Sequence, residues 1–248
     1  MKKEQVVIIT GASRGLGKAL TLAFAKQGAK LAICSRGQKD LVAVRKEALK
    51  IGAADVLAVN ADASNARDID RFISLIELSF GHIDVLINNA STVGTSPIPY
   101  LLDTTEKDFQ DIININTTGP FLMTKRVLPG MLQKGIGSII NVTSEAGKTG
   151  YAGWGVYGIS KFALEGMTET WADEVNDTGI RINMVDPGEM DTEMHALAVP
   201  ECDYELALPE EVVDVFLYLA SDDSKMINGQ RFEAREFTPV SASKGAIQ

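Results

Sequence analysis

The sequence holds few of the residues that build disulfide frameworks and metal sites. Its 248 residues include two cysteines, Cys34 and Cys202, and two histidines, His82 and His195. Neither kind occurs at the spacing of metal ligands, so no metal site is expected. The chain also shows no secretory signal segment, and we therefore expect reduced thiols and a cytoplasmic location.

Long apolar runs and an excess of basic residues are also missing. No stretch approaches the roughly 20 apolar residues that a membrane helix needs, so no membrane partner is expected. The 33 acidic and 24 basic side chains give a formal net charge of -9. Because such a field repels phosphate backbones, we expect no nucleic-acid partner. With 45% hydrophobic and 23% charged residues, the composition is typical of a globular protein.

Short β-branched segments alternate along the chain with segments of helical length and spacing. The expected strands are Val6–Thr10, Lys30–Ser35, Asp55–Asn60, Val85–Asn88, Ser138–Thr143 and Ile180–Val185. The expected helices are Gly17–Gln27, Lys39–Leu49, Asn65–Phe80, Thr105–Leu132 and Tyr157–Asn176. Alternation of this kind predicts βαβ units, and continuously apolar strands are typical of a parallel sheet covered on both faces. The predicted fold class is α/β, with a doubly wound, Rossmann-like, mostly parallel sheet.

The same pattern predicts one domain over residues 1–238. A chain of this length commonly forms a single α/β domain, and neither an internal repeat nor a long linker divides it. The last ten residues, Pro239–Gln248, are small and polar without a core pattern. We expect them to be a frayed tail.

A glycine-rich turn, Thr10–Gly17, links the first expected strand to the first helix. Its glycines stand at positions 11, 15 and 17, in the spacing G-x-x-x-G-x-G. Glycine permits a tight turn and a close approach of a pyrophosphate, while the helix N-terminus offers free N–H donors. Glycine-rich turns are often only turns, but one placed between a first strand and a first helix indicates a dinucleotide site.

The second expected strand is followed by an arginine, not by an acidic residue. Ser35 and Arg36 stand about twenty residues after the turn, where an NAD site carries a carboxylate for the ribose hydroxyls. A guanidinium there can fork onto the 2′-phosphate of NADP(H), and Arg14 in the turn can join it. Both arginines can equally be solvated surface charges. The pattern favours NADP(H), since Asp40 comes too late in the sequence to be a convincing ribose ligand.

Ser144, Tyr157 and Lys161 form a candidate catalytic set. Tyr157 and Lys161 are four residues apart, which places them on one face of a helix. A free phenol has a pKa of about 10, and a nearby ammonium favours the phenolate and lowers that value. Ser144, at the end of a strand, can donate a hydrogen bond to a substrate oxygen. A tyrosine and a lysine at this spacing are nonspecific when taken alone.

Taken together, these elements resemble the short-chain dehydrogenase/reductase family, and the resemblance runs from about Val6 to Asn228. The family's catalytic residues match Asn116, Ser144, Tyr157 and Lys161, and its other motifs match Thr10–Gly17, the acidic Asp62, Asn88–Ala90 and Pro187–Thr192. On this resemblance the expected NADP(H)-binding residues are Gly11, Ser13, Arg14, Gly15, Leu16, Gly17, Ser35, Arg36, Asp62, Ala63, Asn89, Ala90, Tyr157, Lys161, Pro187, Gly188 and Thr192.

The resemblance implies a carbonyl–alcohol interconversion by hydride transfer. Tyr157 would give or take the proton on the substrate oxygen, and Ser144 would orient and polarise the carbonyl. Lys161 would hold the nicotinamide ribose and lower the pKa of the tyrosine, while Asn116 would hold a water that links Lys161 to solvent. Relatives form a four-helix interface from two long helices, so a homotetramer or homodimer is expected.

Three features depart from the family pattern. Ser91 replaces the glycine that follows the N-N-A segment. The segment at about residues 189–208, where relatives build a substrate lid, is short and acidic. It hints at an uncharged or cationic substrate, although its charges can equally solvate a loop. The terminal D-G-G is missing, and Arg231–Phe237 stands in its place, which leaves the last strand in doubt.

Several alternatives stay open at this stage. A 3-oxoacyl-carrier-protein reductase would need a basic docking patch, for which Lys125, Arg126 and Lys134 are available. A regulatory protein that senses NADP(H) would keep the fold without turnover, although its catalytic residues would be expected to be broken. Tyr151 and Trp154 can either line the substrate pocket or pack in the core.

Overall fold

The computed structural model describes residues 4–238, so the predicted tail at 239–248 lies outside the described residues. The strands are β1 Val6–Thr10, β2 Lys30–Ser35, β3 Asp55–Asn60, β4 Val85–Asn88, β5 Gly137–Val142, β6 Ile180–Asp186 and β7 Arg231–Glu233. The helices are α1 Gly15–Lys26, α2 Gln38–Ile51, α3 Ala66–Phe80, α4 Glu106–Ile113, α5 Gly119–Lys134, α6 Gly155–Glu174, α7 Glu193–Ala198 and α8 Asp214–Leu219.

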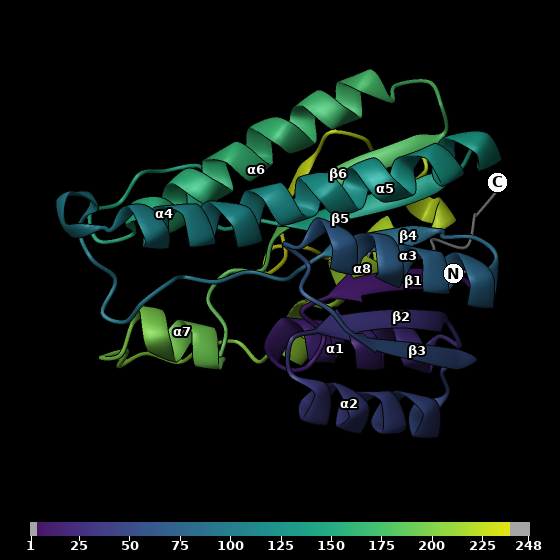
Figure 1. Ribbon diagram of the computed structural model, residues 1–248, viewed down its shortest axis with the longest axis horizontal. Helices are drawn as coiled ribbons and strands as arrows, with labels where there is room; N and C mark the ends of the chain where they lie inside the picture. The colour runs from purple at the N-terminus through teal and green to yellow at the C-terminus, as the bar shows by residue number, and fades with distance from the viewer. Residues whose placement is uncertain (1–3, 239–248) are drawn as a thin grey trace, which may run out of the picture.

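The strands form one parallel sheet in the order β3-β2-β1-β4-β5-β6-β7. Alternate strand residues supply two separate hydrophobic clusters, because successive side chains of a strand point to opposite faces. One cluster contains Val7 and Ile9 with residues of α1, α2 and α8, and the other contains Val6 and Ile8 with residues of α3, α5 and α6. The sheet therefore has a helical layer on each face (Figure 1). The predicted doubly wound α/β class is confirmed.

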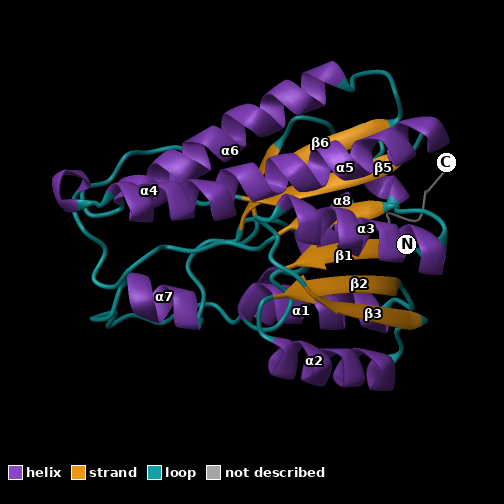
Figure 2. Ribbon diagram, viewed as in Figure 1, coloured by secondary structure: helices purple, strands orange, loops and turns teal. Residues whose placement is uncertain are grey.

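The strand order reverses between β1 and β4, which lie side by side at the centre of the sheet. Doubly wound folds bind ligands at such a point, in the crevice beyond the carboxyl ends of the strands. The arrowheads of the central strands point towards the side of the molecule where α7 lies (Figure 2). The turns that follow β1 and β4, together with α7, therefore surround the predicted ligand crevice.

The segment predicted as the single helix Thr105–Leu132 is helical, but it is not one regular α-helix. The segment forms α4 and α5, joined by a π-helical turn at Asn114–Thr118. A π-turn inserts one extra residue into a helix and is frequent at functional sites. Here it contains Asn116, whose buried side chain bonds to the loop after β4 and to α6. Helical periodicity continues through such a turn, so the sequence pattern alone did not reveal it.

The last strand forms although the terminal D-G-G motif is absent. β7 pairs in parallel with β6, with Phe232 opposite Val185. Phe237 packs 5.3 Å from Tyr218 and 6.3 Å from Phe232, measured between ring centroids. Aromatic packing thus holds the end of the described chain against α8. Among the described residues, none of the helices has the length and apolar character to cross a membrane.

Candidate active site

A cavity of about 640 Å³ lies at the carboxyl ends of the central strands. Of all the residues predicted for the site, Asn116 alone does not line it. The lining set contains Gly11, Ser13, Arg14, Gly15, Leu16, Gly17, Ser35, Arg36, Asp62, Ala63, Asn89, Ala90, Ser144, Tyr157, Lys161, Pro187, Gly188 and Thr192. Residues that are far apart in the sequence therefore meet in one crevice.

The glycine turn is shaped by close backbone contacts. Gly11 has a φ of +66°, and a Cβ atom on Gly17 would lie 2.3 Å from the Gly11 carbonyl oxygen. The first turn of α1 carries no acidic residue, and its N-cap, Arg14, makes no side-chain capping bond. The N–H groups at this helix start are thus available to an anion. The turn fits a dinucleotide pyrophosphate in both shape and donor chemistry.

Asn89 fastens the loop after β4 to the glycine turn. Its side-chain amide donates to the Thr10 carbonyl oxygen at 2.8 Å and to the Gly11 carbonyl oxygen at 3.3 Å. Ser91, which departs from the family pattern, lies in the same loop. Its hydroxyl donates a hydrogen bond to Asn116 Oδ1 at 3.1 Å. Serine at this position therefore adds a tie between the loop and the π-turn.

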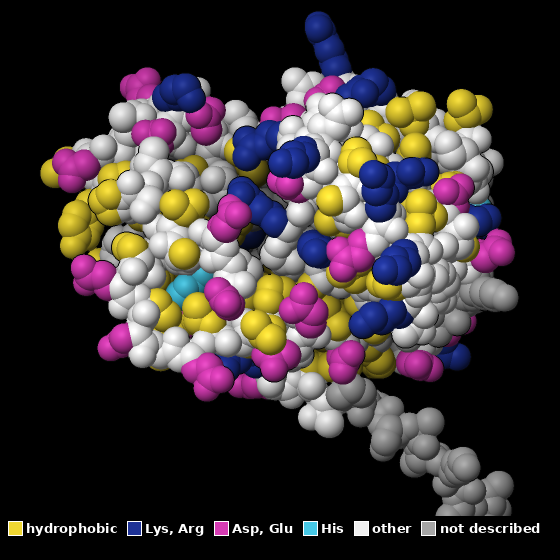
Figure 3. Space-filling model, turned by 90° about the horizontal axis from the view of Figure 1, so that it is seen from below, with side chains coloured by type: hydrophobic (Ala, Val, Ile, Leu, Met, Phe, Trp, Pro, Cys, Tyr) yellow, Lys and Arg dark blue, Asp and Glu magenta, His cyan; other side chains and the backbone are white. Residues whose placement is uncertain are grey.

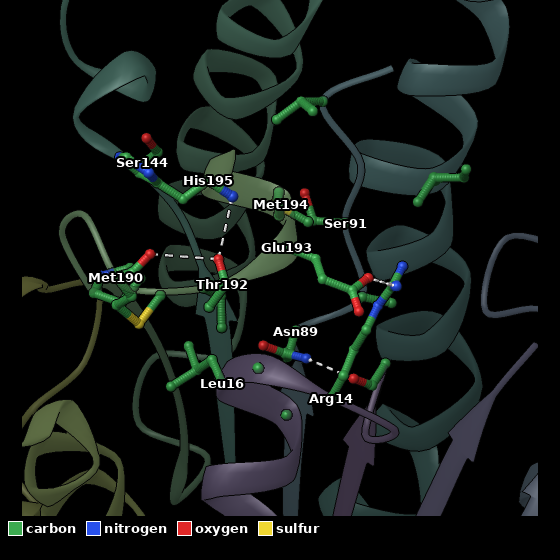
Figure 4. A pocket seen from close by; sticks show the side chains of 18 of the residues that line it. Arg14, Leu16, Asn89, Ser91, Ser144, Met190, Thr192, Glu193, Met194 and His195 are labelled. Carbon is green, nitrogen blue, oxygen red and sulfur yellow. Dashed lines mark hydrogen bonds and ion pairs between the residues drawn. The ribbon is translucent and has the colours of Figure 1, made fainter. Parts of the chain in front are cut away.

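The two predicted phosphate-binding arginines differ in their surroundings. Arg36 lines the cavity just after β2 and is exposed. Arg14 reaches from the glycine turn to Glu193 on α7 and forms an ion pair with it (Figure 4). The side chains of this pair are 68% and 69% exposed. Asp40, which the sequence reading set aside, also lines this end of the cavity.

Asp62 lies at the same end of the cavity, after β3. Its carboxylate accepts hydrogen bonds from the backbone N–H and the hydroxyl of Ser64, at 2.9 and 2.6 Å. Its own N–H donates to Asp68 Oδ2 at 2.9 Å. These bonds fix the loop that includes Ala63, and they make a defined wall where the resemblance places the adenine.

At the other end of the cavity lie Ser144, Tyr157 and Lys161. Ser144 follows β5, whereas Tyr157 and Lys161 project from the same face of α6. The Ser144 side chain hydrogen-bonds to the Tyr157 hydroxyl. Lys161 Nζ donates to the Val142 carbonyl oxygen at 2.9 Å and lies 5.5 Å from the centroid of the Tyr157 ring. A proton donor, a hydrogen-bonding hydroxyl and a cation are thus assembled in one place.

Burial dominates the acid–base properties of this group. Tyr157 and Lys161 are 8% and 2% exposed. Burial disfavours the charged form of each. It raises the pKa of Tyr157 to about 12, against the lowering effect of the Ser144 hydrogen bond. Burial likewise lowers the pKa of Lys161 to about 8, although the charges of Asp186 and Glu165 oppose this shift. The pKa of Tyr157 in the free protein is therefore raised, whereas the resemblance implies a lowered value.

The Asn116 side chain is fully engaged within the protein. Its Oδ1 accepts from the Thr92 N–H at 2.9 Å, and its Nδ2 donates to the Thr92 carbonyl oxygen at 2.8 Å and to Ser160 Oγ at 3.0 Å. The side chain therefore braces the loop after β4 against α6. Its neighbour Ile115 lines the cavity instead.

Residues 189–208 contain α7 and contribute one wall of the cavity. His195 is 9% exposed, with its Nε2 3.4 Å from Glu189 Oε1. The Tyr204 hydroxyl donates to the same Glu189 oxygen at 2.8 Å, and this hydrogen bond raises the pKa of Tyr204 to about 12. Figure 4 shows Met190, Thr192 and Met194 around this wall. The segment is thus held together by polar contacts of its own.

The two aromatic residues left open by the sequence take different places. Trp154 lines the cavity and stands 5.6 Å from the Tyr157 ring, between centroids. Tyr151 is 46% exposed and lines an adjoining cavity of about 470 Å³, which also borders Ser144. Both contribute to pockets, and Trp154 packs on the Tyr157 ring as well.

The sequence reading missed a charged cluster beside Ser144. Glu145, Asp186 and Glu233 bring their carboxylate oxygens within 4.8 Å of one another. Arg231 forms ion pairs with all three. A single cation already lies among the acidic groups of this cluster. The sequence marks Arg231 only as part of the atypical stretch Arg231–Phe237. It does not indicate the ion pairs, because spacing in the sequence gives no signal for contacts between β5, β6 and β7.

The comparisons with known proteins agree with this geometry. A family model described as short chain dehydrogenase matches residues 5–202. The chain is 38% identical to a 3-oxoacyl-[acyl-carrier-protein] reductase of Thermotoga maritima, over 91% of this chain and 94% of that one. It is similar to a solved levodione reductase (TM-score 0.88, 28% identity, covering 94% of this chain and 96% of that chain). An Escherichia coli CFT073 short chain dehydrogenase solved with NADPH is also similar (TM-score 0.87, 28% identity, 94% and 97% covered).

Proposed function

The chain belongs to the short-chain dehydrogenase family, and we propose that it is an NADP(H)-dependent reductase that interconverts a carbonyl group and an alcohol. The observation that carries the proposal is the set of side chains at each of the cavity's two ends. One end holds the buried Ser144, Tyr157 and Lys161, and the other holds Arg36 beside the glycine turn. The space between them is lined by the residues expected to hold a dinucleotide.

The chemistry divides between the cofactor and the chain. When bound, NADP(H) supplies or accepts the hydride. Tyr157 then gives its proton to the carbonyl oxygen, or takes it back from the alcohol, and a pKa of about 12 keeps it in the protonated form that reduction needs. Ser144 holds the substrate oxygen beside the Tyr157 hydroxyl. Lys161 supplies a positive charge that favours phenolate and stabilises the tyrosine after it has lost its proton.

For Asn116 we propose a positioning role. Because both of its amide atoms bond to protein groups, a water in a relay to Lys161 would have to bind the backbone of the π-turn. A π-turn leaves carbonyl oxygens off the ordinary helical ladder. This arrangement supports a proton path through a water bound to the π-turn backbone near Ile115, and not through the Asn116 side chain.

The preference for NADP(H) is assigned to Arg36. Arg36→Ala is expected to raise the KM for NADPH by about tenfold or more, because a lost charge-assisted bond to phosphate is worth roughly 1.5–3 kcal/mol. The KM for NADH should change little. Lys46→Ala, which removes an exposed cation from α2 that does not line the cavity, is the control and should leave both constants near wild type. Equal loss with NADPH and NADH would contradict the assignment.

Arg14 is tied to Glu193, and this pair should compete with the cofactor phosphate. Glu193→Gln removes the competing charge, so the dissociation constant of NADPH is expected to fall by about two- to fivefold, a size that suits an exposed ion pair. NADH, which lacks the 2′-phosphate, should bind as before. Fluorescence titration of both nucleotides measures the effect, and an unchanged NADPH affinity would show that Arg14 does not contact the phosphate.

A second candidate function is 3-oxoacyl-carrier-protein reduction, which the name of the Thermotoga maritima relative supports. The basic side chains available for docking are partly neutralised. Arg126 pairs with Glu77 at 2.9 Å and with Asp70 at 3.6 Å, and Lys134 pairs with Asp84. On the face drawn in Figure 3, basic side chains are likewise interspersed with acidic ones. These pairings favour a substrate without a carrier protein.

NADPH consumption with a panel of ketones, aldehydes, quinones and acyl thioesters tests these readings. Turnover of a free carbonyl compound well above that of acyl thioesters supports the main proposal, whereas the reverse order supports the carrier-linked reductase. The third reading, a protein that senses NADP(H) without turnover, predicts tight NADPH binding and no consumption with any compound. The cavity lining that Ser144, Tyr157 and Lys161 share supports an enzyme.

We further propose a single domain over residues 1–238, a substrate lid at 189–208, a homodimer or homotetramer, and a cytoplasmic location. The one continuous sheet supports the first proposal, and the position of α7 against the cavity supports the second. For assembly, Phe109, Phe121 and Phe162 on α4, α5 and α6 are 41%, 37% and 46% exposed, and exposed apolar groups of this kind mark interaction sites. The two unpaired thiols suit a reducing compartment.

A further inference from the structure

Arg231, the first residue of β7, connects three elements of the active site. Its Nε lies 3.0 Å from Glu165 Oε1 on α6, and its Nη2 lies 2.9 Å from Asp186 Oδ2 at the end of β6. The same Nη2 donates to the backbone carbonyl oxygen of Ser144 at 3.2 Å. Its Nη1 pairs with Glu233 on β7. The side chain is 17% exposed, so the protein holds this guanidinium with most of its donors satisfied.

Each partner of Arg231 is adjacent to a group that the proposed reaction uses. Ser144 itself hydrogen-bonds to Tyr157. Glu165 follows Lys161 by four residues on α6, and its Oε1 also accepts from Thr143 Oγ1 at 2.6 Å. Asp186 precedes the Pro187-Gly188 turn, and its Oδ1 accepts from the Gly188 N–H at 2.8 Å. Arg231 therefore contacts the residues that hold Ser144, Lys161 and the cofactor-binding turn in place.

The charges around Lys161 come from two of these partners. In the described part of the chain, the carboxylates that act on its ammonium are Asp186 from β6 and Glu165 from α6. Asp186 also acts on Tyr157, the titratable neighbour of Lys161 on α6. On β7, Arg231 compensates both carboxylates, and Glu233 lies beyond them with a pKa raised by burial and by the charge of Asp186.

We propose that Arg231 is a positioning residue for the carbonyl–alcohol reaction, which holds the Ser144 backbone and neutralises the Asp186 and Glu165 carboxylates beside Lys161. The proposal rests on the proposed function. Two uncompensated carboxylates would favour the ammonium of Lys161 and the neutral phenol of Tyr157, so the pKa of each would rise when Arg231 is lost. Tyr157 would then give up its proton less readily, and the reaction would slow.

The pH profile of ketone reduction separates this role from simple loss of structure. In the full-length protein, Arg231→Met is expected to lower kcat by about tenfold or more. It should also move the alkaline limb of kcat/KM, assigned to Lys161, upward by about one pH unit. Arg231→Lys, which keeps the charge without the forked donors, should return the limb towards its wild-type position. A loss of activity by the same factor at every pH would overturn the proposal.

Arg181→Met is the matched control. Arg181 is also a partly buried arginine, which donates to Ser224 Oγ at 2.8 Å and to the Leu219 carbonyl oxygen at 2.9 Å. Its partners belong to the end of α8 and to the segment that follows it, and Arg181 does not line the active-site cavity. The variant is expected to lose stability while keeping the wild-type alkaline limb. A shift of that limb equal to the Arg231→Met shift would make the effect nonspecific and overturn the proposal.

A double-mutant cycle tests the same link without turnover. Lys161 and Arg231 both interact with the carboxylates of Asp186 and Glu165, so the unfolding temperature of the double variant should be lower than the sum of the two single shifts predicts. Lys161→Met with Arg181→Met should be additive, as expected for sites without shared partners. Additivity of Lys161→Met with Arg231→Met would overturn the proposal. If the wild-type protein reduced no carbonyl compound, the proposed function would fail, while this cycle would still decide the role of Arg231.

Discussion

Tyr157→Phe is expected to reduce turnover by at least about 10²–10⁴-fold, the range that general acid–base catalysis contributes. The change removes one oxygen, the atom that carries the transferred proton. The ring remains to pack against Trp154, which lies 5.6 Å away. NADPH affinity and the unfolding temperature should therefore stay close to those of the wild-type protein. Steady-state NADPH oxidation with the best substrate of the carbonyl panel measures the loss.

Tyr151→Phe supplies the matched control for this substitution. It makes the same chemical change in a tyrosine that lines the adjoining cavity and whose hydroxyl donates to Glu145 Oε1 at 3.4 Å. Because this tyrosine is 46% exposed and does not line the cavity that holds Lys161, we expect kcat to change by less than about threefold, as for surface substitutions. Near-normal turnover of the Tyr157→Phe variant would remove the proton-transfer role from Tyr157.

Lys161→Met is expected to lower activity and raise stability at the same time. The ammonium favours ionisation of Tyr157, so its loss should cost about 10²-fold or more in kcat. Burying the Lys161 ammonium destabilises the folded state, and for the same reason the pKa of Lys161 is lowered from 10.5 to about 8. The variant should accordingly gain about 1–3 kcal/mol in the free energy of unfolding at pH 7. Functional sites commonly trade stability for activity in this way.

The pH dependence of that gain follows from the direction of the pKa shift. Below pH 8 both the folded and the unfolded chain carry the ammonium, and the full cost of burying it is present. Between pH 8 and 10.5 the folded chain loses the proton while the unfolded chain keeps it. The free energy of unfolding of the wild-type protein therefore rises over this range, and the advantage of Lys161→Met disappears. Urea unfolding of both proteins at pH 7 and pH 10 measures it. A Lys161→Met protein less stable than wild type at pH 7 would contradict the burial argument.

Much of the fold could be predicted from the sequence, because its signals are local. β-branched segments define the strands β1 to β4 to the residue, and the glycines of Thr10–Gly17 define the turn after β1. The π-helical turn at Asn114–Thr118 could not be predicted. Within this turn Asn116 hydrogen-bonds to the loop after β4 and to Ser160, and these bonds connect residues far apart in the sequence.

The site was predictable where a family motif exists and unpredictable elsewhere. Ser144, Tyr157 and Lys161, which the motif predicts as one group, line the same cavity. Arg231 and Glu193 were not assigned to the site, since their partners come from other strands or from the glycine turn. Burial raises the pKa of Tyr157 in the free protein, and it depends on packing around α6, of which the four-residue spacing to Lys161 gives no sign.

Deuterium transfer tests the central claim most directly. The wild-type protein would be given a ketone and NADPH that carries deuterium at the transferable position of C4. The account predicts an alcohol with one deuterium on the former carbonyl carbon, and almost no labelled product in the same time with Tyr157→Phe. NADPH oxidation without deuterium on that carbon, or equal labelling by the Tyr157→Phe protein, would contradict it.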